Sequence, residues 1–167
     1  MIRLYLVRHA AEKEQDGVRV LTSRGRRRFR RAARAFAELE EPVHLICTGR
    51  KPHVKETAKL LARVLDLGEA VELDELSSRA RPASLLRAIG LRSSDGDGVV
   101  LVGHGRQLRR LLASFGLRKR ELPLRKGSIV RLDVDALPRP RACVPRFRVR
   151  PTAGEPEDAF LGIRKAS

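Results

Sequence analysis

Three short apolar runs, each followed by a segment with helical spacing, restrict the folds open to this chain of 167 residues. The runs lie at residues 2–7, 43–47 and 99–102. Nearly continuous apolar runs of this length are typical of strands buried on both faces. Thr22 can cap the helix after the first run, and Pro52 suits the first turn of the helix after the second. The pattern predicts a three-layer α/β/α sandwich with a mostly parallel central sheet.

The rest of the chain adds smaller elements to this framework. A short strand is expected at residues 71–73, a small helix from Pro82 and a further helix after His104. The stretch "KGSIVRLDVD" alternates from Ile129 onward, which predicts a half-exposed antiparallel strand near a sheet edge. "RFRVR" is a further alternating segment. We expect one domain over residues 1–150 and a loosely docked tail over residues 151–167.

Charged and imidazole side chains follow the ends of the predicted strands. Arg8 and His9 end the first apolar run, residues 48–50 follow the second, and His104 follows the third. Ligands in open α/β sheets bind just beyond the carboxyl ends of the strands. We therefore expect these residues to converge on one rim of the sheet.

The residue types on that rim suit phosphoryl transfer. A neutral imidazole can attack phosphorus with one nitrogen while the other donates to a fixed acceptor. Arg8 offers a planar fork for two phosphate oxygens. His104 lies between Gly103 and Gly105 at a predicted strand-to-helix turn, where backbone N–H groups and the helix dipole favour an anion. The residues predict a phosphate pocket with a histidine nucleophile.

Four ordered motifs give the chain a resemblance to a known family. They are "LVRHA", "DGVRVLTSRG", "VLVGHG" and "LRKGSIVRL", at residues 6–10, 16–25, 100–105 and 124–132. In this order they resemble the histidine phosphatase superfamily, which has the phosphoglycerate-mutase-like fold, and within it the SixA-type phosphohistidine phosphatases. The resemblance runs from residue 2 to about residue 134. It implies that His9 is the phosphorylated nucleophile, that Arg8 and His104 bind the phosphoryl group, and that no metal or cofactor takes part.

One departure from the family pattern concerns a second pocket arginine. Family members carry it at the start of the second helix, but the matching stretch here, "GRKPHVKETA", has His53 at that place. Arg50, Lys51 or Lys55 could supply the missing positive charge, and Arg19 and Gly105 are further candidate phosphate-binding residues. Because the charge of a histidine is conditional, we expect weaker and more pH-dependent activity than the family pattern implies.

The second departure concerns the general acid. Mutase-type relatives carry a glutamate that protonates an oxygen leaving group, but residues 76–78 here are Leu-Ser-Ser. Glu12 and Glu75 are candidate substitutes. Imidazole leaves from a phosphoramidate far more readily than an alkoxide leaves from an ester, so the missing acid favours phosphohistidine as the substrate.

The formal net charge of +16 leaves several partners open. Most of the helix start "RGRRRFRRAAR" can be a solvated face, or it can guide an acidic protein or a polyanion. Aromatic residues make up only 4% of the chain, which argues against stacking on single-stranded nucleic acid. Binding to a duplex backbone stays open, and it would depend steeply on salt.

Location and metal content are predicted from absences in the sequence. The chain has no apolar stretch of the roughly 20 residues that span a bilayer, and its first apolar run is short for a signal peptide, so we expect a cytoplasmic protein without membrane contact. Cys47 and Cys143 match no metal or redox spacing. The four histidines also form no ligand motif along the sequence, so no metal site is predicted.

The sequence thus predicts a metal-independent phosphatase that acts through a phosphohistidine intermediate. Protein phosphohistidine is the substrate that the sequence favours. Inorganic phosphate or sulfate should fit the same pocket. Two alternatives stay open. One is a phosphomonoesterase for small molecules, and the other is a degenerate module that binds phosphate or nucleic acid without catalysis.

Overall fold

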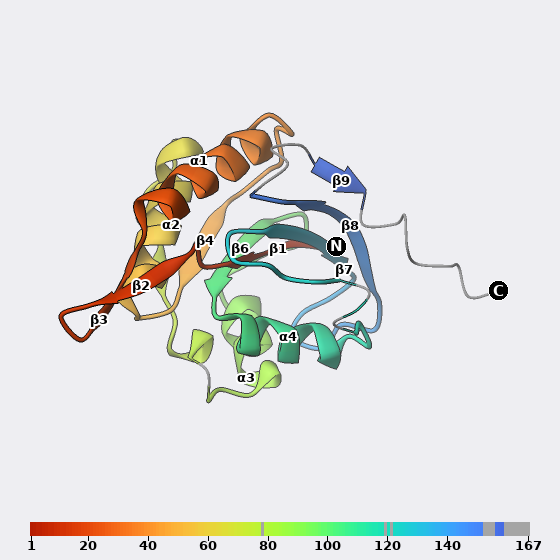
Figure 1. Cartoon of the computed structure of the whole chain (residues 1–167). Helices are drawn as coiled ribbons and strands as arrows, with labels where there is room; N and C mark the ends of the chain where they lie inside the picture. The colour runs from red at the N-terminus through yellow and green to blue at the C-terminus, as the bar shows by residue number, and fades with distance from the viewer. Residues whose placement is uncertain (78, 119, 121, 152–155, 159–167) are drawn as a thin grey trace.

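The computed structural model describes residues 1–77, 79–118, 120, 122–151 and 156–158, and it is built on one seven-stranded sheet (Figure 1). The strands are ordered β5-β4-β6-β1-β7-β8-β9. Their bounds are β1 Ile2–Arg8, β4 Leu45–Thr48, β5 Val71–Glu72, β6 Gly98–Gly103, β7 Ile129–Val134, β8 Cys143–Val149 and β9 Pro156–Asp158. The β5–β4, β4–β6 and β6–β1 pairs are parallel, whereas β1–β7, β7–β8 and β8–β9 are antiparallel. Five of the seven strands (β5, β4, β6, β1 and β8) therefore run in one direction.

Helices cover both faces of this sheet. α1 (Ser23–Ala37) and α2 (Pro52–Val64) lie on one face, and α3 (Pro82–Gly90) and α4 (Gly105–Ser114) lie on the other, after a short 3-10 turn at Asp74–Leu76 (Figure 1). Side chains of β1 alternate between two cores: Tyr5 packs with the α1–α2 side and Leu6 with the α3–α4 side. The predicted three-layer sandwich is confirmed.

The start of α1 is fixed by its local sequence. The Thr22 side chain accepts a hydrogen bond from the Gly25 backbone N–H at 2.9 Å, which caps the helix as predicted. A Cβ atom at Gly25 would collide with the Ala11 carbonyl. The helix can therefore begin tightly against the segment that follows β1, and Phe29 and Phe36 enter the core beneath it.

The prediction of a half-exposed edge strand from Ile129 onward is wrong in its placement. β7 is antiparallel, but it lies between β1 and β8, and most of its residues are buried. The charged side chains of β7 form ion pairs with other residues of the protein. Arg131 pairs with Asp133 at 2.8 Å and with Glu41 at 2.6 Å, and Asp133 also accepts from Arg146 at 2.6 Å. Charged residues in an alternating strand need not face solvent when they neutralise one another.

A second, two-stranded sheet was not predicted. β2 (Glu12–Gln15) and β3 (Val18–Leu21) form an antiparallel hairpin directly after β1. Asp16 and Gly17 connect them with φ angles of 50° and 74°, a backbone that suits the Asp-Gly pair of a two-residue turn. The hairpin is mostly exposed, so it carries no apolar pattern, but its Asp-Gly turn was a usable signal.

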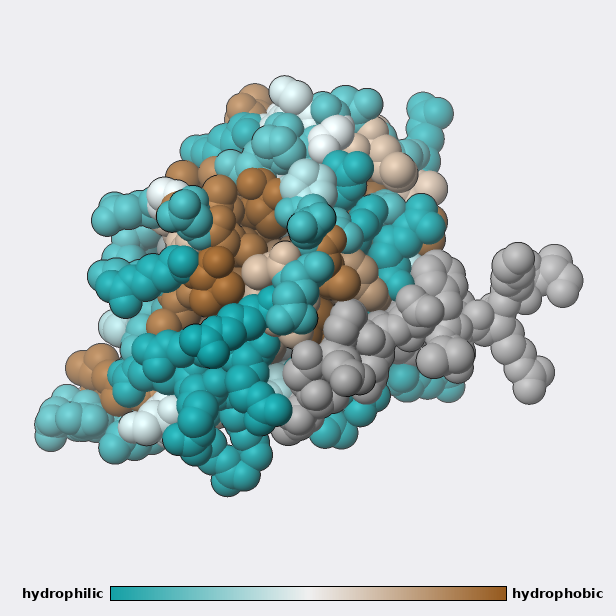
Figure 2. All heavy atoms as spheres, turned by 90° about the horizontal axis from the view of Figure 1, so that it is seen from above, coloured by the Kyte–Doolittle hydropathy of each residue, from teal (hydrophilic) through white to brown (hydrophobic). Residues whose placement is uncertain are grey.

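The predicted domain and tail are described only in part. β9 pairs with β8, while most of the predicted tail at residues 151–167 lies outside the described residues. Seen from above the view of Figure 1, hydrophilic side chains cover most of the surface around one apolar area (Figure 2). Among the described helices, none is both long and apolar enough to cross a bilayer.

Candidate active site

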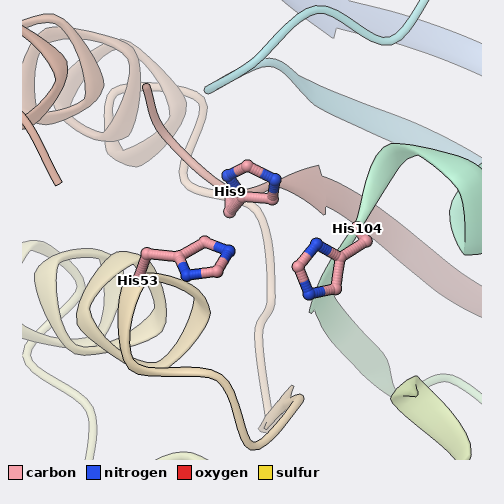
Figure 3. Close-up of side chains that lie close together, drawn as sticks. All are labelled: His9, His53 and His104. Atoms are coloured by element: carbon pink, nitrogen blue, oxygen red, sulfur yellow. The ribbon is translucent and has the colours of Figure 1, made fainter. Parts of the chain in front are cut away.

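Three histidines from separate elements meet at the carboxyl end of the sheet. His9 follows β1, His53 is the second residue of α2, and His104 links β6 to α4. Their ring centroids lie 4.7 Å apart for His9–His53, 5.1 Å for His9–His104 and 5.2 Å for His53–His104. The rings stand edge to face and point toward a common centre (Figure 3). The expected convergence of His9 and His104 thus includes His53 as well.

The His9 ring is held in one orientation and one tautomer. Its backbone N–H donates to the Gly103 carbonyl at 3.1 Å, which continues the parallel pairing of β1 with β6. Its Nδ1 lies 2.9 Å from the Ala10 carbonyl oxygen. A carbonyl only accepts, so Nδ1 carries the proton, and the neutral ring keeps its lone pair on Nε2. Nε2 is therefore the nitrogen available to attack an electrophile.

The α2 helix is anchored to the same segment. The Ala10 backbone N–H donates to the Thr57 hydroxyl at 3.1 Å, and that hydroxyl donates to the His53 carbonyl at 2.8 Å. Ala10, whose carbonyl orients the His9 ring, thus also holds the first turn of α2 through its N–H, which places His53 beside His9.

Burial keeps all three imidazoles neutral. His9 is only 4% exposed, and burial, opposed by the Ala10 carbonyl and Glu12, lowers its pKa to about 4. Burial likewise lowers the pKa of His53, and burial together with His53 lowers the pKa of His104. Near pH 7 the cluster therefore presents neutral rings, which is the form needed for a nucleophile.

Glu12 lies behind the His9 ring. One carboxylate oxygen is 3.4 Å from His9 Nδ1, and the side chain is only 6% exposed. Lys126 Nζ lies 2.9 Å and 3.0 Å from the two carboxylate oxygens, and Arg19 lies 3.1 Å from one of them. Burial raises the Glu12 pKa, but the Lys126 hydrogen bond and His9 outweigh it, and the pKa is lowered overall. Glu12 therefore stays ionised and is unsuited to the general-acid role considered from the sequence.

Arg8 lies against the first residue of α4. Its guanidinium donates to the Leu124 carbonyl at 2.9 Å, and its buried Nε has no hydrogen-bond partner in the described chain. A Cβ at Gly105 would lie 2.7 Å from Arg8 Nε and 2.9 Å from Cζ, so only glycine leaves the guanidinium in place. Gly105 thus serves the site by admitting Arg8 rather than by its own conformational freedom.

Two helix N-termini also face this region. His104 and Lys51 are the cap residues of α4 and α2, and neither helix has a side-chain hydrogen bond capping its first turn. Unpaired backbone N–H groups at a helix start favour an anion. Arg8 and Lys51 add positive charge near His104, whose pKa they lower further. The surroundings of the cluster therefore suit an oxyanion.

The remaining predicted site residues lie around the cluster rather than in it. Arg50 pairs with Asp74 at 2.6 Å, and both line a cavity of about 460 Å³ that reaches His104. Arg19 is paired with Glu12 and is 59% exposed. Glu75 lines a different cavity with Ala83 and Arg87, away from the histidines. Among the described residues that line the His104 cavity, the carboxylate is that of Asp74, which sequence reasoning missed because no motif marks it.

The loop that precedes β7 ties the site to the antiparallel half of the sheet. The Gly127 backbone N–H lies 2.9 Å from the Arg8 carbonyl oxygen and 3.1 Å from that of His9, and the Arg8 N–H donates to the Ser128 carbonyl at 3.2 Å. Lys126, next in the chain, holds Glu12. The segment "KGS" at residues 126–128 thus fixes both the backbone of Arg8 and His9 and the Glu12 carboxylate.

Comparisons with known proteins find solved structures that share this fold. No protein-family model matches the sequence, and no curated protein matches it. The protein histidine phosphatase SixA, solved with tungstate, aligns with a TM-score of 0.75 over 89% of this chain and 97% of that chain, at 17% identity. A protein assigned as phosphohistidine phosphatase SixA from Agrobacterium tumefaciens aligns with a TM-score of 0.66 over 78% and 91%, at 24% identity.

A third structure extends the comparison to an enzyme with a different substrate. A phosphoserine phosphatase from Entamoeba histolytica, solved with 3-phosphoglyceric acid, aligns with a TM-score of 0.61 over 80% of this chain and 91% of that chain, at 13% identity. SixA proteins and small-molecule phosphatases thus share this architecture. The chain has the fold of the histidine phosphatases, the phosphoglycerate-mutase-like fold that its four motifs predicted.

Proposed function

We propose that this protein is a phosphatase that uses His9 as its nucleophile and acts on protein phosphohistidine. The observation that carries the proposal is the His9 ring itself. Its Nδ1 is bound to the Ala10 carbonyl, so its Nε2 lone pair is available to the centre shared with His53 and His104. A neutral, buried and oriented imidazole beside helix N-termini and Arg8 is what phosphoryl transfer to nitrogen requires.

The reaction has two balanced steps. His9 Nε2 attacks the phosphorus of the substrate, the bond from phosphorus to the substrate's imidazole breaks, and that imidazole leaves with a proton from solvent. Water then attacks the phosphorus on His9 and the Nε2–P bond breaks. Inorganic phosphate departs. One proton of the attacking water goes to solvent, which restores the proton that the leaving imidazole took from solvent in the first step.

Protein groups compensate the charges that appear along this path. While His9 carries the phosphoryl group, its ring is positive, and Glu12 and the Ala10 carbonyl lie beside its Nδ1. The Arg8 Nε–H, which has no partner in the described chain, and the N–H groups of the helix N-termini can donate hydrogen bonds to the phosphoryl oxygens. Tungstate, the ligand of the similar SixA structure, is a tetrahedral oxyanion like phosphate.

The substrate class follows from the acid that is missing. Glu12 is held ionised, and the one described carboxylate lining the His104 cavity, Asp74, is paired with Arg50. A phosphohistidine needs no strong acid, because its leaving group is an imidazole. A phosphomonoester leaves as an alkoxide and would need Asp74 to be freed and protonated.

Phosphate trapping tests the nucleophile. The protein is mixed with radiolabelled phosphoramidate and quenched in alkali, and the acid-labile phosphate on it is counted. We expect a label on the parent chain and none on His9→Ala. Equal labelling of the two chains would overturn the proposal and favour a module that only binds phosphate.

An Asp74→Asn variant separates the two substrate classes. Hydrolysis of a phosphohistidine protein should change less than about twofold, because Asp74 gives its leaving group nothing it needs. If the enzyme instead acts on small phosphate esters through Asp74, turnover of phosphoserine should exceed that of phosphohistidine. It should also fall by about 100-fold in the variant, the low end of a general-acid contribution.

A further inference from the structure

The three histidines of the site also form a set of metal ligands. One nitrogen from each of His9, His53 and His104 can be chosen so that all three lie within 4.8 Å of one another. The residues come from three separate elements and are far apart along the chain, so no spacing motif announces them. His9 and His53 are buried, at 4% and 2% exposure, and His104 is half-buried.

The His9 ring already has the outer contacts typical of a metal-bound imidazole. Ligating histidines usually donate their other nitrogen to a carbonyl or a carboxylate, which fixes the tautomer and the ring plane. His9 Nδ1 has both partners, the Ala10 carbonyl at 2.9 Å and the Glu12 carboxylate at 3.4 Å. His53, in contrast, has an unsatisfied nitrogen, because its Nδ1 is buried without a hydrogen-bond partner in the described chain.

The donor set selects the kind of ion. Among the described residues, this group of candidate ligands contains imidazole nitrogen alone. Mg²⁺ and Ca²⁺ require oxygen ligands, whereas Zn²⁺, Co²⁺, Ni²⁺ and Cu²⁺ bind imidazole well. Arg8 and Lys51 oppose any cation by charge, so an ion must be held by strong bonds to nitrogen.

The rings must move only slightly to close on such an ion. With metal–nitrogen bonds of about 2.0–2.1 Å and tetrahedral angles, ligating nitrogens lie about 3.4 Å from one another. Shifts on the order of 1 Å at the ring nitrogens bring the present separations to that value. Three protein ligands also leave a fourth position open, as in other three-histidine zinc sites.

We propose that His9, His53 and His104 bind one divalent transition-metal ion of the zinc class, and that this ion blocks the phosphatase reaction by occupying Nε2 of His9. The inhibitory half of this inference rests on the proposed function, whereas the binding half does not. The set needs His53, because the arginine that the family pattern has at this place cannot ligate a metal. Metal and phosphoryl group then compete for one nitrogen.

Cobalt spectroscopy tests the binding half without any activity. The full chain, prepared without a histidine tag, is titrated with Co²⁺, and the visible absorption of a four-coordinate ion is followed, with Zn²⁺ displacing it. We expect saturation at one equivalent. Loss of an outer contact alone typically weakens a metal site about 10–100-fold, so replacing the ligand in His53→Arg should weaken binding by more than about 100-fold.

His44 provides the matched control. It is a histidine outside the cluster, 53% exposed, whose Nδ1 accepts from the Gly98 backbone N–H at 3.0 Å. His44→Asn keeps an acceptor there and should bind Co²⁺ like the parent. Failure of the parent to bind one equivalent, or unchanged binding in His53→Arg with loss in His44→Asn, would overturn the site.

Phosphate trapping tests the inhibitory half. Stoichiometric Zn²⁺ should abolish labelling of the parent at His9, and a chelator should restore it, while His53→Arg should label equally with and without Zn²⁺. Labelling of Zn²⁺-loaded parent would overturn the inhibition but leave the site standing. A parent that binds Co²⁺ yet never labels, even when free of metal, would mean that the proposed phosphatase function has failed and that the metal site has not.

Discussion

The carboxylate of Glu12 lies 3.4 Å from Nδ1 of His9, on the side of the ring opposite to Nε2, the proposed nucleophile. This contact depends on the β2–β3 hairpin, since Glu12 is the first residue of β2 and pairs with Leu21 of β3. The hairpin therefore has a role in the site although it lies outside the main sheet.

Neutralising Glu12 should slow turnover. In Glu12→Gln the positive ring of phosphorylated His9 loses its nearby negative charge, and we expect kcat to fall about 10-fold, which corresponds to about 1.4 kcal/mol. KM should stay unchanged, because Glu12 lies on the Nδ1 side of the His9 ring, opposite to the proposed attacking nitrogen. Steady-state kinetics measure both. Glu14→Gln, an exposed neighbour in β2, is the control, and an equal fall in that variant would show that the hairpin and not the charge matters.

Adding one methyl group at Gly105 should disturb Arg8. A Cβ there would lie 2.7 Å from Arg8 Nε, so the guanidinium must move away. We expect Gly105→Ala to weaken competitive inhibition by tungstate about 10-fold or more, which is the loss of one charge-assisted hydrogen bond. Gly68→Ala is the matched control, since no atom lies within 4 Å of its Cβ position. Unchanged inhibition in Gly105→Ala would remove Arg8 from the oxyanion site.

An arginine at position 53, where the pattern of the similar family has one, should raise activity. His53→Arg supplies a permanent positive charge where burial now keeps an imidazole neutral. We expect turnover of an aryl phosphate to rise about 10-fold and its dependence on pH to flatten, because arginine does not titrate in this range. Turnover that stays the same or falls would contradict the role of position 53 in phosphate binding.

Acid should destabilise the folded protein through the buried histidines. The His9 pKa is about 4 in the folded chain and near 6.5 when unfolded, so the unfolded state binds more protons between these values. The free energy of unfolding therefore falls as the pH drops from about 7 to 4, by about 3 kcal/mol for His9 alone. Urea unfolding at several pH values measures this slope, which should be shallower in His9→Gln and unchanged in His44→Gln. A pH-independent midpoint would contradict the burial of a neutral ring.

Sequence patterns located the strands that are buried on both faces and the helix start that has a side-chain cap. β1, β4 and β6 are apolar on both faces, so their runs stand out, and the Thr22 cap marks the start of α1. The prediction for β7 was wrong because the charge of Arg131 was read as a sign of solvent exposure. Arg131 is instead paired with Asp133, two residues further along the strand, and with Glu41, which is far away in the sequence.

The residues of the site also fall into those that simple strand patterns predict and those that they do not. Arg8 ends β1, His9 and His104 directly follow β1 and β6, and the pairing of these two strands brings the three residues together. The contact of Glu12 with His9 depends on a hairpin folding back, and the pairing of Asp74 with Arg50 joins a 3-10 turn to the loop before α2. Contacts that depend on a hairpin or a turn outside the main sheet leave no periodic trace in a sequence.

The hydrogen bonds of Gly127 with the carbonyls of Arg8 and His9 have a consequence for how the chain tolerates change in length. An insertion at the tip of the β2–β3 hairpin would extend into solvent and leave His9 where it is. An insertion of one residue between Lys126 and Ser128 would shift the backbone register beneath the imidazole and withdraw the lysine from Glu12. Chemistry at one strand end is thus secured by a three-residue stretch more than a hundred positions away.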